Sequence, residues 1–300
     1  MDGLLLLDKP AGPTSHDVVE AVRGLLGGAK AGHSGTLDPG ASGLLVLMVG
    51  RATKLAPYLP ADPKVYEGSI LLGVRTDSMD VAGEVVAEGS YGGGPEQARL
   101  ALASLVGEVD QVPPMFSAVK YRGEPLYRYA RRGEEVPRRS RRIRVYGSEM
   151  TAFRALGSRA EVDFLVSCSP GTYVRELAAR VGELLGCGGA ISRLRRLSSG
   201  PFRLEEASPL EGLLSSRQRA ELVLLPLERA VDGYRKVVVS GAWSKAARNG
   251  APLREEMVGE GVEGVEEGEI VAVVDEAGKL VGMHEVVERR PFTSRPRRII

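Results

Sequence analysis

A loop rich in glycine and proline, between residues 32 and 43, carries the side chains best suited to chemistry. It reads Gly-His-Ser-Gly-Thr-Leu-Asp-Pro-Gly-Ala-Ser-Gly, so five of its twelve residues are glycine or proline. Such density is typical of unusual backbone angles or of close approach by another molecule. The loop would present His33, Thr36 and Asp38 from a shaped turn. The pattern alone leaves open an ordinary surface turn in which Asp38 only hydrogen-bonds nearby backbone.

Arg175 is a second candidate, because it falls in the first turn of a predicted helix that follows Ser169-Pro170-Gly171-Thr172. A cation there opposes the helix dipole by about 0.3–1 kcal/mol, so a purpose within the helix itself is not evident. We expect an anionic partner nearby. A carboxylate such as Asp38 would be held ionised and aimed by this pairing. The alternative is an ordinary arginine that faces solvent.

Several other catalytic constellations are excluded by their strict spacing. The chain has no G-x-x-x-x-G-K-[ST] phosphate loop and no H-E-x-x-H motif, and residues 32–36 lack the final glycine of a serine-hydrolase elbow. His16, His33 and His284 are isolated from one another and from cysteine, so a zinc site has little support. We therefore expect no metal.

The elements that position these residues follow from hydrophobic periodicity. Apolar residues at helical spacing predict helices at 15–26 and 173–185, each followed by glycines. The unbroken apolar run 44–49, directly after the candidate loop, predicts a strand buried on both faces. Alternation predicts further strands at 66–72 and 162–168. Helices and strands mix without a regular βαβ period, which favours an α+β fold built on a mixed sheet.

The length of 300 residues allows one large core and a small appended module. β-rich segments from residue 234 onward predict that module, so we expect domains at 1–232 and 233–300. A hydrophobic content of 43% and a charged content of 26% are those of a globular protein. The chain has no long apolar run, no signal-peptide core and no CxxC pair, only Cys168 and Cys187. These features predict a cytoplasmic protein with reduced thiols.

Charge is strongly segregated along the chain, although the net charge is only +1. The segment 120–144 holds ten basic residues against three glutamates, so it carries +7 and the rest of the chain carries −6. Three tyrosines lie among these bases. That mixture is expected for binding a folded RNA rather than for reading base edges in a duplex.

The motifs resemble, in order and spacing, those of the TruB and dyskerin pseudouridine synthases. The resemblance covers about residues 3 to 205, so chance is a poor explanation. The segments that carry it are Leu7-Asp8-Lys9-Pro10, Gly32 to Pro39, Lys64-Val65-Tyr66, Arg75-Thr76-Asp77, Pro113 to Lys120, Gly171 to Arg175 and Leu194-Arg195-Arg196-Leu197. Ala82 departs from the family, since many relatives are polar or acidic there.

The resemblance implies a fold as well. We expect a mixed, largely antiparallel sheet flanked by helices, a basic thumb insertion at about residues 113–145 and a small β-rich, PUA-like RNA-binding domain at the C-terminus. Residues 120–133 are similar to the thumb of stand-alone bacterial enzymes. The dyskerin branch, which works within a guide-RNA particle, typically lacks this segment.

The implied reaction is the isomerisation of uridine to pseudouridine, without a cofactor, at position 55 in the T-arm loop of tRNAs. Asp38 would be the nucleophile, attacking either C6 of the base or C1′ of the ribose, with Arg175 as its partner. Tyr66 would stack on the flipped base and help to remove the C5 proton. The residues implied to bind substrate are His33, Tyr66, Tyr173 and Leu194, with Lys9 as support for the pocket.

The thumb would bind RNA phosphates through Lys120, Arg131, Arg132, Arg138 and Arg139. We expect tRNA as partner, with no membrane and no obligate protein partner. Two alternatives stay open. One is a guide-dependent ribosomal RNA synthase of the dyskerin branch, and the other is a non-catalytic RNA-binding or RNA-folding protein on the same scaffold.

Overall fold

A mixed sheet organises most of the molecule. The structure, a computed structural model, describes residues 1–215, 221 and 223–300. Within this part of the chain the main sheet runs β14-β1-β3-β12-β4-β11-β10-β7, with β2 added to β3 and β13 to β12. All its pairings are antiparallel except β1 with β14 and β3 with β12, so the expected mixed, largely antiparallel sheet is confirmed. Its strands are β1 (Gly3–Lys9), β2 (Ala31–His33), β3 (Ser42–Val49), β4 (Lys64–Leu72), β7 (Gly107–Gln111), β10 (Arg141–Leu156), β11 (Arg159–Cys168), β12 (Gly189–Ser199), β13 (Phe202–Arg203) and β14 (Ser208–Pro209).

β1 and β3 are buried on both faces, as the unbroken apolar run of β3 predicts. Successive side chains of a strand point to opposite faces, so the two halves of each run enter different cores. In β3, Leu45 and Leu47 join the core under the helices, whereas Leu44 and Val46 join a second core on the other face. β3 pairs with β1 from Gly43 to Val49, and this pairing places the loop that precedes the strand.

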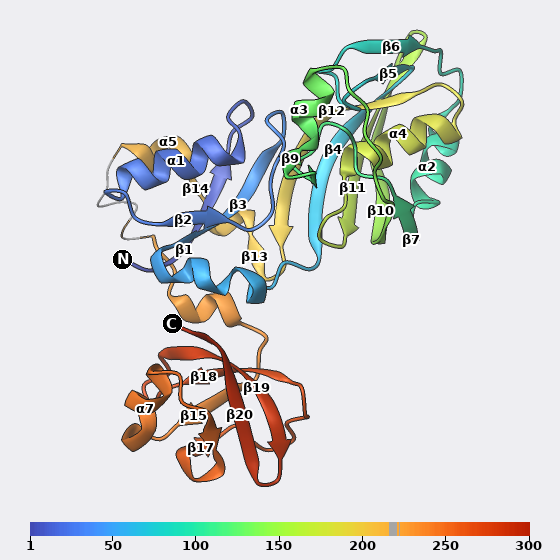
Figure 1. The fold of residues 1–300 in the computed structure, drawn as a ribbon. Helices are drawn as coiled ribbons and strands as arrows, with labels where there is room; N and C mark the ends of the chain where they lie inside the picture. Colours follow the sequence, from blue (N-terminus) through green and yellow to red (C-terminus); the bar gives the residue numbers. More distant parts are fainter. Residues whose placement is uncertain (216–220, 222) are drawn as a thin grey trace.

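Helices cover one face of the sheet (Figure 1). α1 (Ser15–Leu25) begins with a capping box in which Thr14 caps the helix and Asp17 bonds back to Thr14, and α4 (Val174–Leu184) matches the second predicted helix. α2 (Pro95–Ala103) and α5 (Leu210–Leu214) also pack into this core. After β13 the chain forms η2 (Leu204–Glu206) and then α5; residues 216–220 and 222 lie outside the described chain.

The opposite face of the sheet packs on η1 (Gly50–Tyr58) and on a second, smaller sheet at the C-terminus. This six-stranded sheet, counted within the described residues, has the order β16-β20-β19-β18-β15-β17. The predicted β-rich C-terminal domain is thus confirmed, and Figure 1 shows it below the main sheet, next to η3 (Leu227–Val231). Its elements are β15 (Lys236–Val239), α7 (Gly241–Arg248), β16 (Leu253–Arg254), η4 (Glu255–Met257), β17 (Val258–Glu260), β18 (Ile270–Val274), β19 (Leu280–Arg289) and β20 (Phe292–Ile299).

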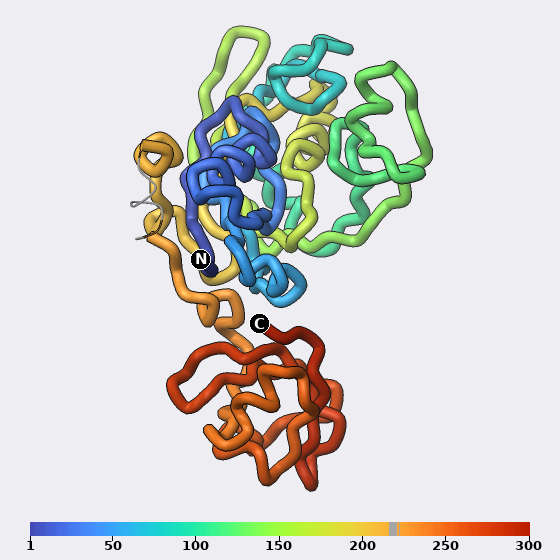
Figure 2. The backbone as a smooth tube through the Cα atoms, turned by 60° about the vertical axis from the view of Figure 1, so that its left-hand side comes forward, coloured from blue at the N-terminus to red at the C-terminus, as the bar shows by residue number. Residues whose placement is uncertain are grey.

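A basic lobe, residues 112–140, leaves the main sheet after β7 and returns at β10; we call it the thumb. β7 and β10 pair with each other, Gln111 opposite Arg141, so the thumb is anchored at the edge of the sheet. It contains β8 (Lys120–Tyr121), β9 (Glu124–Pro125) and α3 (Leu126–Arg131). Figure 2 shows it in green, projecting from the rest of the molecule. A separate hairpin of β5 (Val74–Thr76) and β6 (Val85–Glu88) follows β4.

Candidate active site

A cavity of about 220 Å³ opens where the glycine-rich loop meets the start of α4. Loop residues 35–38, strands β4 and β12, the thumb and the residues before α4 all contribute to its wall. The lining residues are Gly35, Thr36, Leu37, Asp38, Ala41, Lys64, Tyr66, Ser117, Ala118, Arg141, Gly171, Thr172, Tyr173, Val174 and Leu194. The predicted residues Asp38, Tyr66, Tyr173 and Leu194 therefore meet at one cavity.

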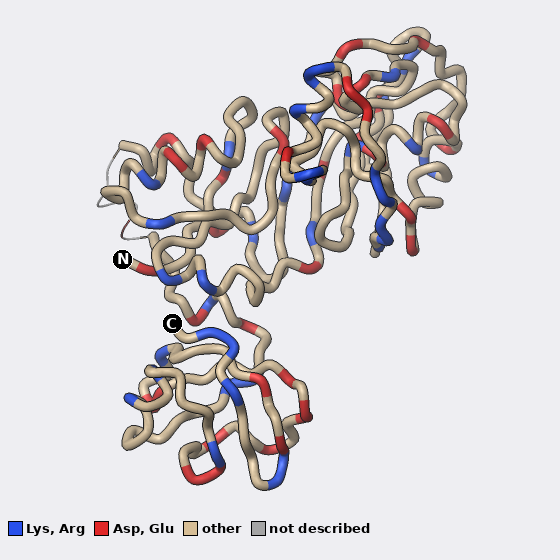
Figure 3. The backbone as a smooth tube through the Cα atoms, viewed as in Figure 1, with Lys and Arg blue, Asp and Glu red and all other residues tan. Residues whose placement is uncertain are grey.

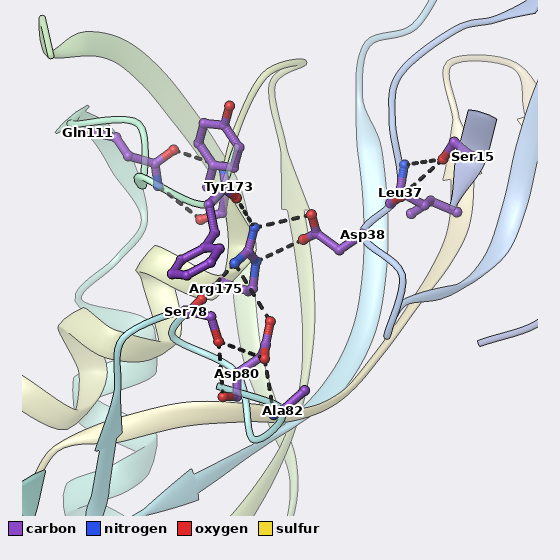
Figure 4. Close-up of polar contacts among 10 residues, drawn as sticks. Ser15, Leu37, Asp38, Ser78, Asp80, Ala82, Gln111, Tyr173 and Arg175 are labelled. Carbon is purple, nitrogen blue, oxygen red and sulfur yellow. Dashed lines mark hydrogen bonds and ion pairs between the residues drawn. The ribbon is translucent and has the colours of Figure 1, made fainter. Parts of the chain in front are cut away.

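Asp38 and Arg175 form a two-pronged ion pair, as predicted. Arg175 Nε lies 2.8 Å from Asp38 Oδ2, and Arg175 Nη2 lies 3.1 Å from Oδ1 (Figure 4). Parallel N–H bonds to both oxygens of a carboxylate fix its orientation as well as its charge. The Arg175 side chain is only 4% exposed, whereas that of Asp38 is 35% exposed. Arg175 is thus not a solvent-facing arginine, and the carboxylate remains reachable from the cavity.

Three further contacts immobilise the Arg175 guanidinium. Nη1 donates to the Ser78 carbonyl at 2.6 Å, and Nη2 donates to the Phe116 carbonyl at 2.8 Å. Asp80 Oδ2 lies 3.6 Å from Nη1. The guanidinium therefore links the β5–β6 hairpin, the thumb and the glycine-rich loop (residues 32–43), and it has little freedom to follow Asp38.

Asp80 is a residue of this network that the sequence alone did not single out. Its carboxylate accepts hydrogen bonds from the Ser78 hydroxyl at 2.8 Å and from the Ala82 backbone N–H at 3.1 Å (Figure 4). The second bond also accounts for the departure at Ala82, because the backbone and not the side chain makes this contact. The acidic turn Thr76-Asp77-Ser78-Met79-Asp80 was the available signal.

Buried side chains hold the glycine-rich loop in place through hydrogen bonds to its backbone. Ser15 Oγ donates to the Leu37 carbonyl at 3.0 Å and accepts from the Leu37 N–H at 2.8 Å. Lys9 is fully buried, and its Nζ donates to the carbonyls of Pro10, Pro39 and Ala41. Burial lowers the pKa of the Lys9 ammonium to about 8. Its hydrogen bonds brace the turn that follows Asp38, which agrees with a supporting position for Lys9.

Tyr173 is fixed by a residue that the sequence did not flag, Gln111 at the end of β7. The Gln111 amide donates to the Tyr173 carbonyl at 3.0 Å and accepts from the Tyr173 N–H at 2.7 Å. The Arg141 guanidinium stacks 4.7 Å from the centre of the Tyr173 ring and also donates to the Gly171 carbonyl. These contacts position the residues before α4, and Arg141 adds a cation to the cavity wall.

His33 does not reach the cavity wall. It lies in β2, opposite Leu47 of β3, and it is half-buried. Burial and the nearby cations Arg196 and Lys64 lower the pKa of its imidazole. A protonated His33 is therefore disfavoured in the free protein, and contact with a bound nucleotide would require a change in this segment.

Sequence reasoning assigned no role to two buried cations, Lys64, which lines the cavity, and Arg196, which lies close to Gly35 of the same wall. Lys64 is 7% exposed and Arg196 is fully buried. Burial, together with the charge of Arg196, lowers the pKa of the Lys64 ammonium to about 8. Gly35, at φ +85°, leaves room for both, since a Cβ there would overlap Lys64 Nζ and stand 3.5 Å from Arg196 Nη1. The loop glycine thus serves this close approach.

The predicted RNA-binding cations of the thumb differ in their partners. Arg132 pairs with Glu124 at 3.0 Å and with Glu134 at 2.8 Å, and Arg138 pairs with Glu135 at 2.7 Å. Within the described chain, Lys120, Arg131 and Arg139 form no ion pair. Basic and acidic segments alternate through this lobe in Figure 3.

Two classes of feature are not found in the described residues. No group of three or more His, Cys, Asp or Glu side chains there could hold a metal ion. No helix there is long and apolar enough to cross a membrane.

Comparison with known proteins adds two family matches and many relatives. Residues 23–174 match the model of the TruB family pseudouridylate synthase N-terminal domain, and residues 175–232 match that of the tRNA pseudouridylate synthase B C-terminal domain. The tRNA pseudouridine synthase B of Geobacillus kaustophilus is 44% identical over 85% of this chain and 91% of its own length. That of Bacillus licheniformis is 45% identical over 84% of this chain and 83% of its own.

Solved structures share the fold. A Cbf5-Nop10-Gar1 complex contains a chain with a TM-score of 0.71 at 29% identity, covering 95% of this chain and 78% of the other. An H/ACA RNP bound to a substrate RNA containing 2′-deoxyuridine gives a TM-score of 0.74 at 25% identity, covering 99% and 84%. With both models matched in sequence and 44% identity to a relative over 85% of this chain, the chain belongs to the TruB family of pseudouridylate synthases.

Proposed function

We propose that the protein isomerises uridine to pseudouridine at position 55 in the T-arm loop of tRNAs in the cytoplasm, with Asp38 as nucleophile. The observation that carries this proposal is the two-pronged pairing of a buried Arg175 with a reachable Asp38 at the cavity wall. An arginine beside a carboxylate favours its anionic form, which is the nucleophilic one. Asp38 attacks the nucleotide at C6 of the base or at C1′ of the ribose.

The size of the cavity suits one base. Its volume of about 220 Å³ is below the roughly 300–1,000 Å³ of pockets that enclose whole drug-sized ligands. A stacked strand would not fit, so the target uridine enters after flipping out of its loop, at a cost of a few kcal/mol. Tyr66, Leu194 and Tyr173 line the wall and offer the ring and apolar surfaces against which a flipped base packs.

Tyr66 takes part in the last step of the isomerisation. After the base has turned and its C5 has bonded to C1′, the C5 hydrogen must leave as a proton. Tyr66 is 6% exposed and lines the cavity, and its phenolic oxygen accepts this proton once its own proton has passed to solvent. Burial raises the pKa of the Tyr66 phenol, so it rests as a neutral hydroxyl.

RNA binding is assigned to the thumb and to the C-terminal domain. The thumb lies beside the cavity and holds Arg175 through the Phe116 carbonyl, so it links substrate binding to the catalytic pair. Lys120, Arg131, Arg132, Arg138 and Arg139 contact phosphates of the T-arm. Residues 1–232 form the catalytic domain, and residues 233–300 form a PUA-like module that contacts the same tRNA.

The decisive experiment maps pseudouridine at single-nucleotide resolution in an unmodified tRNA transcript incubated with the protein and buffer alone. The expected product is one new pseudouridine at position 55. Similarity to chains in the Cbf5 and H/ACA RNP structures keeps a guide-dependent enzyme as the second candidate. Modification of RNA only after a guide RNA and partner proteins are added would favour that candidate and overturn the stand-alone function.

A further inference from the structure

Arg196 is a charged residue that neighbours Tyr66 in the sheet. β12 and β4 are antiparallel neighbours, and Arg196 stands directly opposite Tyr66 in their register. Side chains of directly opposed residues point to the same face and touch. A β-bulge follows at once, between Arg196 and Ser198, and it sets the local twist of β12 at this point. The placement of Arg196 beside Tyr66 is therefore built into the sheet.

The guanidinium of Arg196 is fully buried and only partly satisfied. Its Nε donates to the Leu44 carbonyl at 2.7 Å, and its Nη2 donates to the Gly35 carbonyl at 3.1 Å. Nη1 is buried and has no hydrogen-bond partner within the described chain. No carboxylate pairs with Arg196 there either. A buried cation without a charge partner is costly to keep, so a chemical purpose is expected.

The surroundings of the Tyr66 hydroxyl make Arg196 its main source of positive charge. Burial raises the pKa of the Tyr66 phenol, and Arg196 opposes this effect. Cys168 from β11 and Asp38 from the glycine-rich loop act in the same direction as burial, while Lys64 lies on the same face of β4, two residues from Tyr66. A phenolate formed at Tyr66 would thus meet a guanidinium on one side and Asp38 across the cavity.

We infer that Arg196 is a positioning residue for the proton-transfer step: it orients the Tyr66 hydroxyl and stabilises the phenolate that takes the proton from C5. This inference rests on the proposed function, because it assigns the C5 proton to Tyr66. Nη1, which is buried without a hydrogen-bond partner among the described residues, is the group that meets the phenolate oxygen.

The step balances without a cofactor. The neutral Tyr66 phenol first loses its proton to solvent, which leaves a phenolate beside Arg196. The C5–H bond then breaks, its proton goes to the phenolate oxygen, and its electron pair becomes the C5–C6 double bond. On attack at C1′, the pair of the C6–N1 double bond moves to N1, which takes a proton from water; on attack at C6, the pair of the C6–O bond leaves with the Asp38 carboxylate. Proton transfer restores the neutral phenol for the next turnover.

A pair of substrates separates this step from the rest of the reaction. In 5-fluorouridine, fluorine replaces the C5 hydrogen, so the glycosidic bond can be broken and remade to C5 but no C5 proton can be removed. A T-arm stem-loop with uridine or 5-fluorouridine at the target position is incubated with excess enzyme. The rate of appearance of the C5–C1′ product is then measured for each substrate in a single turnover.

The main variant is Arg196→Met, which removes the charge at similar size. General acid–base steps contribute about 10²–10⁴-fold, so the uridine rate should fall by about 10²-fold while the 5-fluorouridine rate changes little. Arg196→Lys, which keeps the charge, should recover part of the uridine rate. The matched control is Arg195→Met on the same strand, whose side chain pairs with Asp8 at 2.7 Å and does not line the cavity. It should leave the ratio of the two rates unchanged.

Equal loss on both substrates, or no loss on either, would overturn the inference. If Arg196→Met does not fold, Arg196→Lys carries the test with a 5-deuterated uridine substrate. Its C5 isotope effect should exceed that of the wild type, and an equal isotope effect would contradict the inference. Asp38→Asn in the same assay tests the proposed function separately from the inference about Arg196. Rearrangement of either substrate by this variant would contradict the proposed function itself.

Discussion

Arginine is used in opposite ways in the cavity and in the thumb. Arg175 is 4% exposed and held by Asp38, two carbonyls and Asp80. Arg132 is 42% exposed, pairs with Glu124 and Glu134, and stacks 4.6 Å from the centre of the Tyr129 ring. The buried Arg175 guanidinium is held in one position, because a desolvated charge must keep all its hydrogen-bonding and charged partners. Arg132 can exchange its partners, since exposed ion pairs stabilise a protein by only about 0–1 kcal/mol.

This difference fits the two tasks. In the proposed function the nucleophile must be aimed, so its partner is immobile, whereas RNA phosphates would replace the partners of the thumb arginines when tRNA binds. The three thumb glutamates pair with Arg132 and Arg138 and leave Arg131 and Arg139 open.

Arg175→Lys tests the cavity side and Arg132→Lys the thumb side with the same change. Lysine keeps the charge but cannot reproduce the planar fork or all the contacts of Arg175. We expect the single-turnover rate to fall by about 10²–10³-fold for Arg175→Lys, since misplacement by about 1 Å can cost 10²-fold. Arg132→Lys should change it by less than about threefold. Comparable losses of single-turnover rate in the two variants would contradict the difference between the buried and the exposed arginine.

Lys64→Met probes the cost of burying charge at the cavity. The pKa of Lys64 is lowered to about 8 in the folded protein, so its protonated form costs stability. That cost is fully present below pH 8 and is relieved as pH rises toward about 10.4, the value of an unfolded lysine. Lys64→Met should therefore raise the free energy of unfolding by about 3 kcal/mol at pH 7, and by little near pH 10.

Denaturant unfolding at pH 7 and pH 10 measures this difference. The control is Lys245→Met on α7, where the side chain is exposed and the change should stay within about 0.5 kcal/mol. Parallel pH curves for the wild type and Lys64→Met would show that Lys64 is not buried as a costly cation.

Two double variants test whether the unpaired and the paired arginines of the thumb differ in RNA binding. Arg131→Gln with Arg139→Gln removes cations that are open in the free protein, and Arg132→Gln with Arg138→Gln removes cations already paired. The open pair should weaken tRNA binding by about tenfold or more and reduce the slope of log affinity against log salt by about 1.4–1.8, for two phosphates. The paired set should have a smaller effect. Arg154→Gln, an exposed arginine paired with Glu161 and Asp163, is the control.

The order of the two thumb variants is the informative result. A larger effect from Arg132 and Arg138 would mean that their glutamates do not compete with RNA. An unaltered salt slope in both would mean that the thumb does not touch phosphates.

Asp80→Asn gives the smallest effect. Asparagine can still accept the bonds from Ser78 and Ala82, so only the charge 3.6 Å from Arg175 is lost. We expect about a tenfold lower single-turnover rate with unchanged tRNA affinity, about 1.4 kcal/mol of transition-state stabilisation. An unchanged rate, or weaker affinity with an unchanged rate, would take Asp80 out of the catalytic network.

Sequence reasoning located the parts of the site that are locally encoded. Asp38 stands out because its loop is rich in glycine, and Arg175 because it occupies an unfavourable place at a helix start. Asp80 and Gln111 were missed because only the fold brings them to Arg175 and Tyr173, 95 and 62 residues away in sequence. Periodicity carries no information about such distant polar contacts.

Prediction of the fold from the sequence had the same limit. β3 was predicted because burial on both faces leaves an unbroken apolar run. β20 was not predicted as a strand, since its arginines obscure the alternation. Arg295 and Arg297 both pair with Glu285 on β19, so charge across strands replaces hydrophobic burial on that face. His33 was placed at the substrate by family resemblance, and its half-buried position in β2 could not be read from a loop motif.

The most direct test of the central claim is the single-turnover rate of pseudouridine formation by Asp38→Asn, measured beside its tRNA affinity. Asparagine keeps the shape of the side chain but removes the ionised oxygen that Arg175 holds. The account predicts no detectable pseudouridine at position 55, with tRNA binding largely retained. Pseudouridine formation at the wild-type rate would contradict it.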